Sequence, residues 1–154
     1  MGNSIENMFE YHCWITIDHQ EFGRLWENGE IEGEEYYRQI DLVVEKLKDK
    51  IDELHAPLKD QCKLIKGTNG QITLHFSGLR NHYNSEPLEI VEWIRDNAPY
   101  SYGLLYIHND WDSENAGNFV VYRLARNEIT KFKDDLLSPY PETLEKGYYD
   151  DETD

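Results

Sequence analysis

The stretch that decides the fold is Phe9-Glu10-Tyr11-His12-Cys13-Trp14-Ile15-Thr16-Ile17. Its apolar residues alternate with mostly polar ones, and this period of two is typical of a β-strand that buries one face. Trp14 falls among the polar positions, so either a helix or loop covers that face or the indole is exposed. We expect a covered indole, because large aromatic side chains are usually mostly buried.

Downstream of Gly33, apolar residues recur at spacings of three and four, which predicts a long helix from about Glu34 to His55 that Pro57 ends. The residues of this apolar stripe are Tyr37, Ile40, Val44, Leu47, Ile51 and Leu54. A second, short helix is expected between Ser85, a candidate N-cap residue, and Pro99.

Five further segments are predicted to be strands. Asn69-Gly70 lies between segments 62–66 and 72–76, and this dipeptide favours the positive φ angles of a tight hairpin. Segments 102–107 and 119–124 are apolar on both faces, which predicts central strands of a sheet covered on at least one side, joined by a polar loop. A last strand at 129–132 is expected after an Asn127-Glu128 turn. The fold class is therefore α+β, with a mostly antiparallel sheet of five or six strands, one long helix and one short helix.

Length and composition predict one domain. A chain of 154 residues buries, on folding, roughly 70% of the surface that its unfolded state exposes. We expect residues 1–7 to be a flexible N-terminal extension, 8–145 a single α+β domain and 146–154 an acidic C-terminal tail. Sequence alone leaves open whether Met1 or Met8 is the native start.

The chain is strongly acidic, with 31 Asp and Glu against 15 Lys and Arg and a net charge of −16. This charge repels nucleic acid and anionic membranes and attracts basic partners, although it also serves solubility alone. No signal peptide and no run of ~18 apolar residues is present, so a cytoplasmic location is expected. Cys13 and Cys62 form no Cys-x-x-Cys motif, which favours reduced thiols over a zinc or redox site.

The sequence carries no recognisable catalytic motif. A Gly-x-Ser-x-Gly elbow, a phosphate-binding glycine loop and a His-Glu-x-x-His helix are all absent, and the six histidines show no ligand spacing. The segment from Asp110 offers several oxygen ligands, but Asn115 and Val121 occupy the positions where a calcium loop needs Gly and Glu. We therefore expect no catalytic residue, no metal, no cofactor and no enzymatic activity.

Two acidic segments with nearby aromatic residues are candidates for binding a partner. Acidic side chains steer basic partners over long range, and aromatic side chains often anchor interfaces. Part of the first segment also favours the positive N-terminus of the long helix. For Tyr37, a core role and an interface role are equally open. The candidate residues are Glu27, Glu30, Glu32, Glu34, Glu35, Tyr37, Asp110, Trp111, Asp112 and Glu114.

Four short motifs occur in a defined order: Phe9 to Trp14, Ser101-Tyr102-Gly103-Leu104-Leu105-Tyr106, Val121-Tyr122-Arg123-Leu124-Ala125-Arg126 and Leu137-Ser138-Pro139. Through them the chain resembles the immunity protein 7 family of bacterial polymorphic-toxin systems, from Met8 to about Glu145. The resemblance implies one α+β domain, encoded beside a toxin that is often a nuclease and is inhibited by direct binding. It assigns no inhibitory contact to any residue. A small acidic enzyme of unrecognised type and an acidic adaptor domain are the alternatives.

Overall fold

The protein is built on a six-stranded sheet in the order β2-β3-β1-β4-β5-β6, and every neighbouring pair is antiparallel. The computed structural model describes residues 8–115 and 117–139. The strands are β1 (Phe9–Ile17), β2 (Lys63–Lys66), β3 (Ile72–Arg80), β4 (Tyr102–Asn109), β5 (Phe119–Ala125) and β6 (Glu128–Asp134). The predicted α+β class and antiparallel sheet are confirmed. The predicted extension 1–7 and the acidic tail lie outside the described residues.

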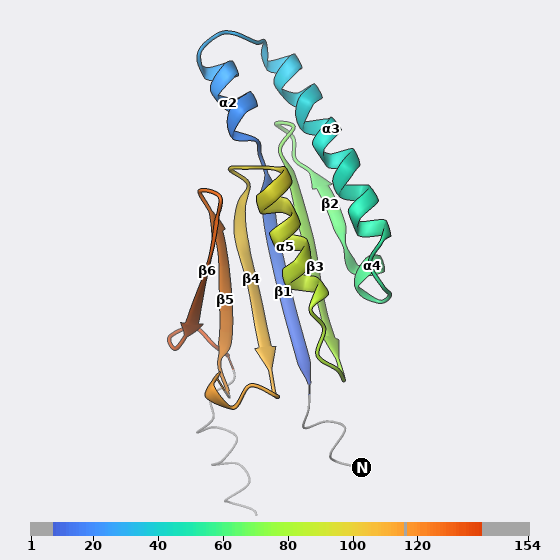
Figure 1. The fold of residues 1–154 in the computed structure, drawn as a ribbon, viewed down its shortest axis with the longest axis vertical. Coiled ribbons are helices and arrows are strands. Elements are labelled where there is room, and N and C mark those ends of the chain that lie inside the picture. The colour runs from blue at the N-terminus through green and yellow to red at the C-terminus, as the bar shows by residue number, and fades with distance from the viewer. Residues whose placement is uncertain (1–7, 116, 140–154) are drawn as a thin grey trace, which may run out of the picture.

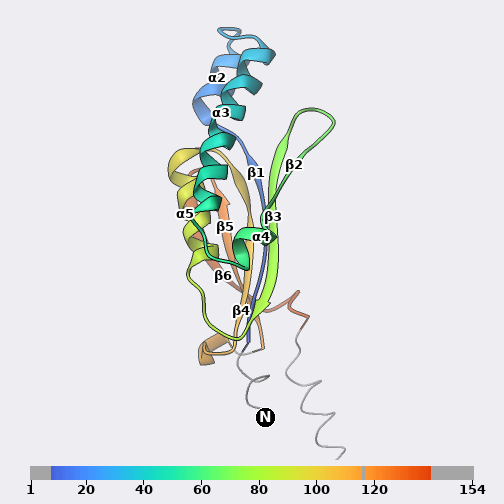
Figure 2. The same cartoon turned by 90° about the vertical axis from the view of Figure 1, so that its right-hand side faces the viewer.

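Helices α3 and α5 lie on the same face of the sheet (Figures 1 and 2). The helices of the described residues are α2 (Gln20–Glu27), α3 (Gly33–Asp52), α4 (Leu58–Gln61) and α5 (Glu86–Asn97), with a 3-10 turn η1 at Ser113–Asn115. Figure 1 shows that α2 and the first turns of α3 extend beyond one end of the sheet. The molecule therefore has a helical end, and an opposite end formed by the β4–β5 loop.

Strand β1 lies in the middle of the sheet and pairs with β3 on one side and β4 on the other. Directly opposed residues share a face, so Cys13 lies between Phe76 and Leu105 on the helix-covered face. Tyr11 and Ile15 on that face are fully buried. The alternation of the quoted stretch thus has the predicted consequence of one buried face.

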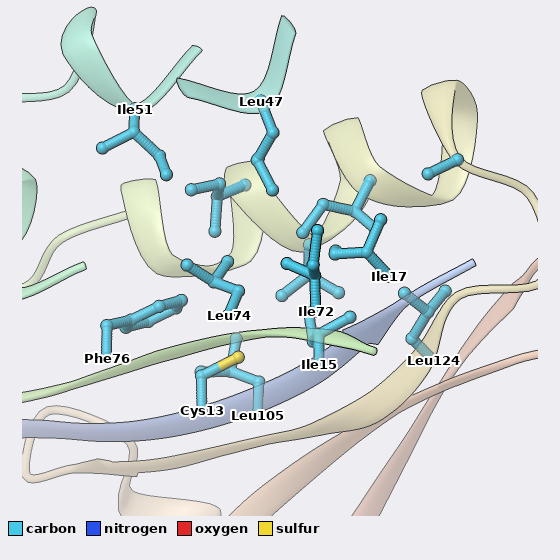
Figure 3. Close-up of a cluster of buried hydrophobic side chains, with 14 of the residues drawn as sticks. Cys13, Ile15, Ile17, Leu47, Ile51, Ile72, Leu74, Phe76, Leu105 and Leu124 are labelled. Carbon is cyan, nitrogen blue, oxygen red and sulfur yellow. The ribbon is translucent and has the colours of Figure 1, made fainter. Parts of the chain in front are cut away.

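The core lies between this face and the two longer helices (Figure 3). Leu47 and Ile51 of α3 point toward α5 and the sheet, where Ile15, Leu74 and Leu105 project from three adjacent strands. Burying such side chains stabilises the fold by about 1.5–3 kcal/mol each relative to leaving them exposed. This apolar layer fixes where α3 runs, and hence where its N-terminal end stands.

The C-terminal boundary of α3 and the capping of α5 differ from the sequence predictions. Helix α3 ends at Asp52, before Pro57, because the chain tightens into a turn in which the Leu54 N–H donates to the Ile51 carbonyl (3.0 Å). Ser85 precedes α5 but makes no capping hydrogen bond, since its hydroxyl donates to Glu89. Helices α2 and α4 were not predicted. Helix α2 contains no buried residue and α4 has four residues, so neither carries a long apolar stripe.

Both hairpin connections, β2–β3 and β5–β6, contain residues with positive φ angles. The β2–β3 hairpin is confirmed, but of the Asn69-Gly70 pair only Gly70 has a positive φ, at 85°, and the connection spans residues 67–71. The β5–β6 turn uses Arg126 and Asn127, at φ 52° and 66°, so it starts one residue earlier than predicted. Two consecutive positive φ angles match the twist of the flanking strands.

The second face of the sheet differs from the favoured prediction. Trp14 is 37% exposed and meets Tyr102 edge to face, with 6.2 Å between ring centroids. Figure 2 shows α3 and α5 on the opposite side of the sheet. The predicted cover over the indole is therefore wrong for the described part of the chain.

We predict that Leu47→Ala lowers the free energy of unfolding by about 2–5 kcal/mol, because a fully buried side chain leaves a cavity. Leu42→Ala on the same helix is the matched control: Leu42 is 50% exposed, so its loss should stay within about 0.5 kcal/mol. Urea unfolding followed by circular dichroism measures both. Equal losses in the two variants would contradict the assigned packing of α3.

Candidate partner-binding site

The sequence-predicted binding residues fall into two groups at opposite ends of the molecule (Figure 1). The first surrounds the α2–α3 connection, just past the end of β1. The second lies in the β4–β5 loop, where the Asp110 N–H donates to the Met8 carbonyl just before β1 (3.1 Å). A strand of nine residues spans about 30 Å. The two groups therefore form separate surfaces.

The α2–α3 end carries several carboxylates without ion-pair partners. Glu35 is paired: its carboxylate accepts from Arg38 (2.7 Å) and Gln39 (2.7 Å), and the hydrogen bond from Arg38 lowers the pKa of Glu35 most. Within residues 8–115 and 117–139, the other four glutamates of the group form no ion pair. These are Glu27, Glu30, Glu32 and Glu34, and all four are exposed.

Three aromatic rings hold α2 against α3 at this end. Trp26 lies 4.9 Å from Tyr36 and 5.7 Å from Tyr37, measured between ring centroids. The indole also packs on Gly33, where an added Cβ would come within 3.1 Å of it. Trp26 is nevertheless 41% exposed. Tyr37 is half-buried and packs against the core, so it combines a structural role with accessible surface.

The aromatic cluster is tied to the end of β1 through Asp18. The Tyr36 hydroxyl donates to the Asp18 carboxylate. Burial, followed by this hydrogen bond and the Asp18 charge, raises the pKa of Tyr36 well above its usual range. Ser101 holds the Asp18 backbone: its Oγ accepts from the Asp18 N–H (2.9 Å) and donates to the Asp18 carbonyl (3.1 Å). The Asp18 carboxylate is thereby positioned from two sides.

A hollow of about 340 Å³ opens beside this cluster. Its lining residues are Asp18, Gly23, Trp26, Glu27 and Tyr36. Two carboxylates and two aromatic rings therefore meet around one open space. The sequence analysis did not single out Asp18 or Gly23. Helix α2 was not predicted, so the sequence offered no reason to ask why a glycine lies inside it.

Two of the three carboxylates of the β4–β5 loop, those of Asp110 and Asp112, make hydrogen bonds that stabilise the loop. Asp110 accepts from the Met8 N–H (2.8 Å) and lies 3.5 Å from His108. Asp112 accepts from the Glu114 N–H (3.2 Å) and from the Asn115 side chain (2.6 Å). Trp111 is 46% exposed. This loop thus presents an accessible indole and the Glu114 carboxylate, while its two aspartates shape it.

Residues of the recognised motifs have structural roles. Ser101 fixes Asp18, and Gly103 allows close strand approach, since an added Cβ would lie 2.0 Å from the Trp14 carbonyl oxygen. Ser138 accepts from the Phe119 N–H (2.8 Å) and joins the end of β6 to the start of β5. These contacts therefore stabilise the sheet, and those of Ser101 also position Asp18 next to the α2–α3 end.

Comparison with known proteins decides the family. The model of immunity protein 7 matches residues 8–146. The chain belongs to the immunity protein 7 family. No curated protein and no solved structure matches it. Membership assigns the chain the role of an immunity protein, which acts against a toxin. The resemblance seen in the short motifs is thereby confirmed over nearly the same range.

Across residues 8–115 and 117–139, no three His, Cys, Asp or Glu side chains group so as to hold a metal ion. Over the same residues, none of the helices has the length and apolar character that crossing a bilayer requires.

We predict that Tyr36→Phe reduces the alkaline loss of stability. The pKa of Tyr36 is raised in the folded state, so its stabilisation is fully present below the unfolded pKa of about 10 and is lost as pH rises toward the folded pKa. Above pH 10, the free energy of unfolding should therefore fall with pH more steeply in the wild type than in Tyr36→Phe. The two slopes should differ by about 1.4 kcal/mol per pH unit.

Urea unfolding at a series of alkaline pH values measures this slope. Tyr83→Phe, which removes the hydroxyl of an exposed tyrosine (61%), is the control and should keep the slope of the wild type. Identical slopes for the wild type and Tyr36→Phe would contradict the prediction.

Proposed function

We propose that this immunity protein neutralises one cognate toxin by direct one-to-one binding, and that the α2–α3 end is its principal contact surface. One observation carries the proposal: four exposed glutamates without ion-pair partners in the described residues lie at the same end of the molecule as an exposed tryptophan, Trp26. They are Glu27, at the end of α2 and beside Trp26 in one hollow, Glu30 and Glu32 in the α2–α3 connection, and Glu34 in the first turn of α3. Glu35 and Tyr37 border the same surface.

The two kinds of residue support different steps of binding. Uncompensated surface charge attracts a basic partner over long range and raises the association rate by orders of magnitude at low salt. A rigid aromatic side chain instead slows dissociation once its surface is desolvated. Trp26 is held by Tyr36 and Tyr37, so little side-chain entropy is lost when a partner covers it.

The toxin class that fits this surface is a nuclease with a basic domain. A nuclease binds polyanionic substrate and therefore carries clustered positive charge, which is complementary to a chain with net charge −16. The immunity protein itself then acts as a non-enzymatic inhibitor, without binding nucleic acid or membrane. We place the encounter in the cytoplasm, where nucleic acid is accessible and where the free thiols of Cys13 and Cys62 stay reduced.

The β4–β5 loop is proposed as a secondary contact. Trp111 and Glu114 supply the accessible indole and carboxylate, while Asp110 and Asp112 keep the loop in shape. A partner reaches both ends only if it extends along the length of the sheet. Loss of the loop contact alone should therefore weaken binding without removing charge steering at the α2–α3 end.

We predict that replacing Glu27, Glu30, Glu32 and Glu34 by glutamine slows association with the toxin of the neighbouring gene. A surface charge acts mainly on the association rate and its salt dependence, so the rate at low salt should fall about tenfold or more. The slope of rate against salt should also become shallower. Stopped-flow fluorescence over a salt series measures both quantities.

A charge-matched variant supplies the control. Glu45, Asp49, Asp52 and Glu53 are four exposed acidic residues in the C-terminal half of α3 and at its end. Changing them to the corresponding amides removes the same net charge far from the α2–α3 end. Equal rates and salt slopes in the two variants would show that overall charge, and not this surface, attracts the toxin.

A further inference from the structure

The hollow beside Trp26 has the composition of a pocket for a cationic side chain. Its volume, about 340 Å³, lies at the lower end of the range for ligand pockets. Trp26 and Tyr36 supply aromatic surface, and Asp18 and Glu27 supply carboxylates. We propose that this hollow receives the guanidinium group of one arginine side chain of the toxin. The inference rests on the proposed function, because it names the anchor within the α2–α3 end.

The aromatic walls favour a flat cation. Guanidinium groups stack on tryptophan and tyrosine faces, and arginine makes such contacts more often than lysine. Trp26 is fixed on one side by Tyr36 and at its edge by Gly33, and it remains 41% exposed. The hollow therefore presents a preorganised indole surface before any partner arrives.

The carboxylates favour the same group. Within residues 8–115 and 117–139, neither Asp18 nor Glu27 forms an ion pair. Arg24, the basic residue of α2, also forms no ion pair there. A carboxylate accepts two parallel N–H bonds from guanidinium, which lysine cannot donate with this geometry. An arriving arginine thus meets acceptors that no cation of the described chain occupies.

Gly23 keeps the hollow open. Residues 23, 26 and 27 lie on one face of α2, since positions three and four apart are neighbours on a helix. An added Cβ at Gly23 would lie 3.9 Å from both the Asp18 carboxylate and the Tyr36 ring. Glycine inside a helix is destabilising relative to alanine, and here its lack of a side chain leaves the space free.

The first test uses short peptides and needs no toxin. N-acetyl-Gly-Arg-Gly-amide is titrated into the protein while the indole N–H resonance of Trp26 is followed by NMR. The matched probe replaces arginine by citrulline, which keeps the shape and removes the charge. We expect a saturable shift of Trp26 in the millimolar range with the arginine peptide and none with the citrulline peptide. Equal responses to both peptides, or no response to arginine, would overturn the proposal.

Two variants separate filling of the hollow from misfolding. Gly23→Leu should abolish the arginine response, whereas Gln20→Leu adds a leucine to an exposed position of α2 outside the lining and should preserve it. Glu27→Gln keeps the size of an exposed side chain and should weaken the response severalfold. An arginine response that survives both Gly23→Leu and Glu27→Gln would place the peptide elsewhere and refute the inference.

The second test distinguishes the pocket from charge steering. With the toxin of the neighbouring gene, Gly23→Leu should raise the dissociation rate about tenfold or more and leave the salt slope of association unchanged. The variant for steering here changes only Glu30, Glu32 and Glu34, which lie outside the lining of the hollow. If this three-glutamine variant associates normally while Gly23→Leu dissociates faster, the proposed steering fails and the pocket stands. If only association changes, the steering stands and the pocket is wrong. If the toxin does not bind, the peptide titration still decides the pocket.

Discussion

The structure depends on burying one face of β1 between two antiparallel neighbours. Tyr11, Cys13 and Ile15 share the helix-covered face with Phe76, Leu74 and Leu105. A slip of one residue in this pairing would turn all of them to the open face, because strand side chains alternate strictly. The free energy of this burial therefore sets the register of β3 and β4. It also provides the surface on which α3 and α5 pack.

The same constraint supports the α2–α3 end, which we propose as the binding surface. Once β1 and β4 are in register, Ser101, which directly precedes β4, lies next to the end of β1. Its hydroxyl hydrogen-bonds to the backbone N–H and carbonyl of Asp18. Asp18 then accepts the Tyr36 hydroxyl, and Tyr36 packs on Trp26. A chain of neighbouring contacts thus leads from the sheet to the exposed indole.

Local patterns predicted elements more reliably than boundaries or caps. The period of two in β1, the helical stripe of α3 and the Asn69-Gly70 hairpin were all recognised, because each follows from residues close together in sequence. The C-terminal end of α3 was less accurate, since a turn hydrogen bond at Leu54 ends the helix before Pro57. Ser85 was correctly placed before α5, but its side chain does not cap the helix, and Asn84 accepts from the Glu86 N–H instead. Helix α2 was missed because tertiary contacts of Trp26, and no buried stripe of its own, hold it in place.

By itself, the sequence determined the α+β class, the acidic character and the family motifs, because composition and periodicity are properties of the chain before folding. It also indicated the glutamates from Glu27 to Glu35 as a charged segment. Only the tertiary structure placed these residues at the end opposite the β4–β5 loop and joined Asp18 and Tyr36 to Trp26 around one hollow. Contacts between residues distant in sequence arise from packing, and neither spacing nor charge along the chain specifies them.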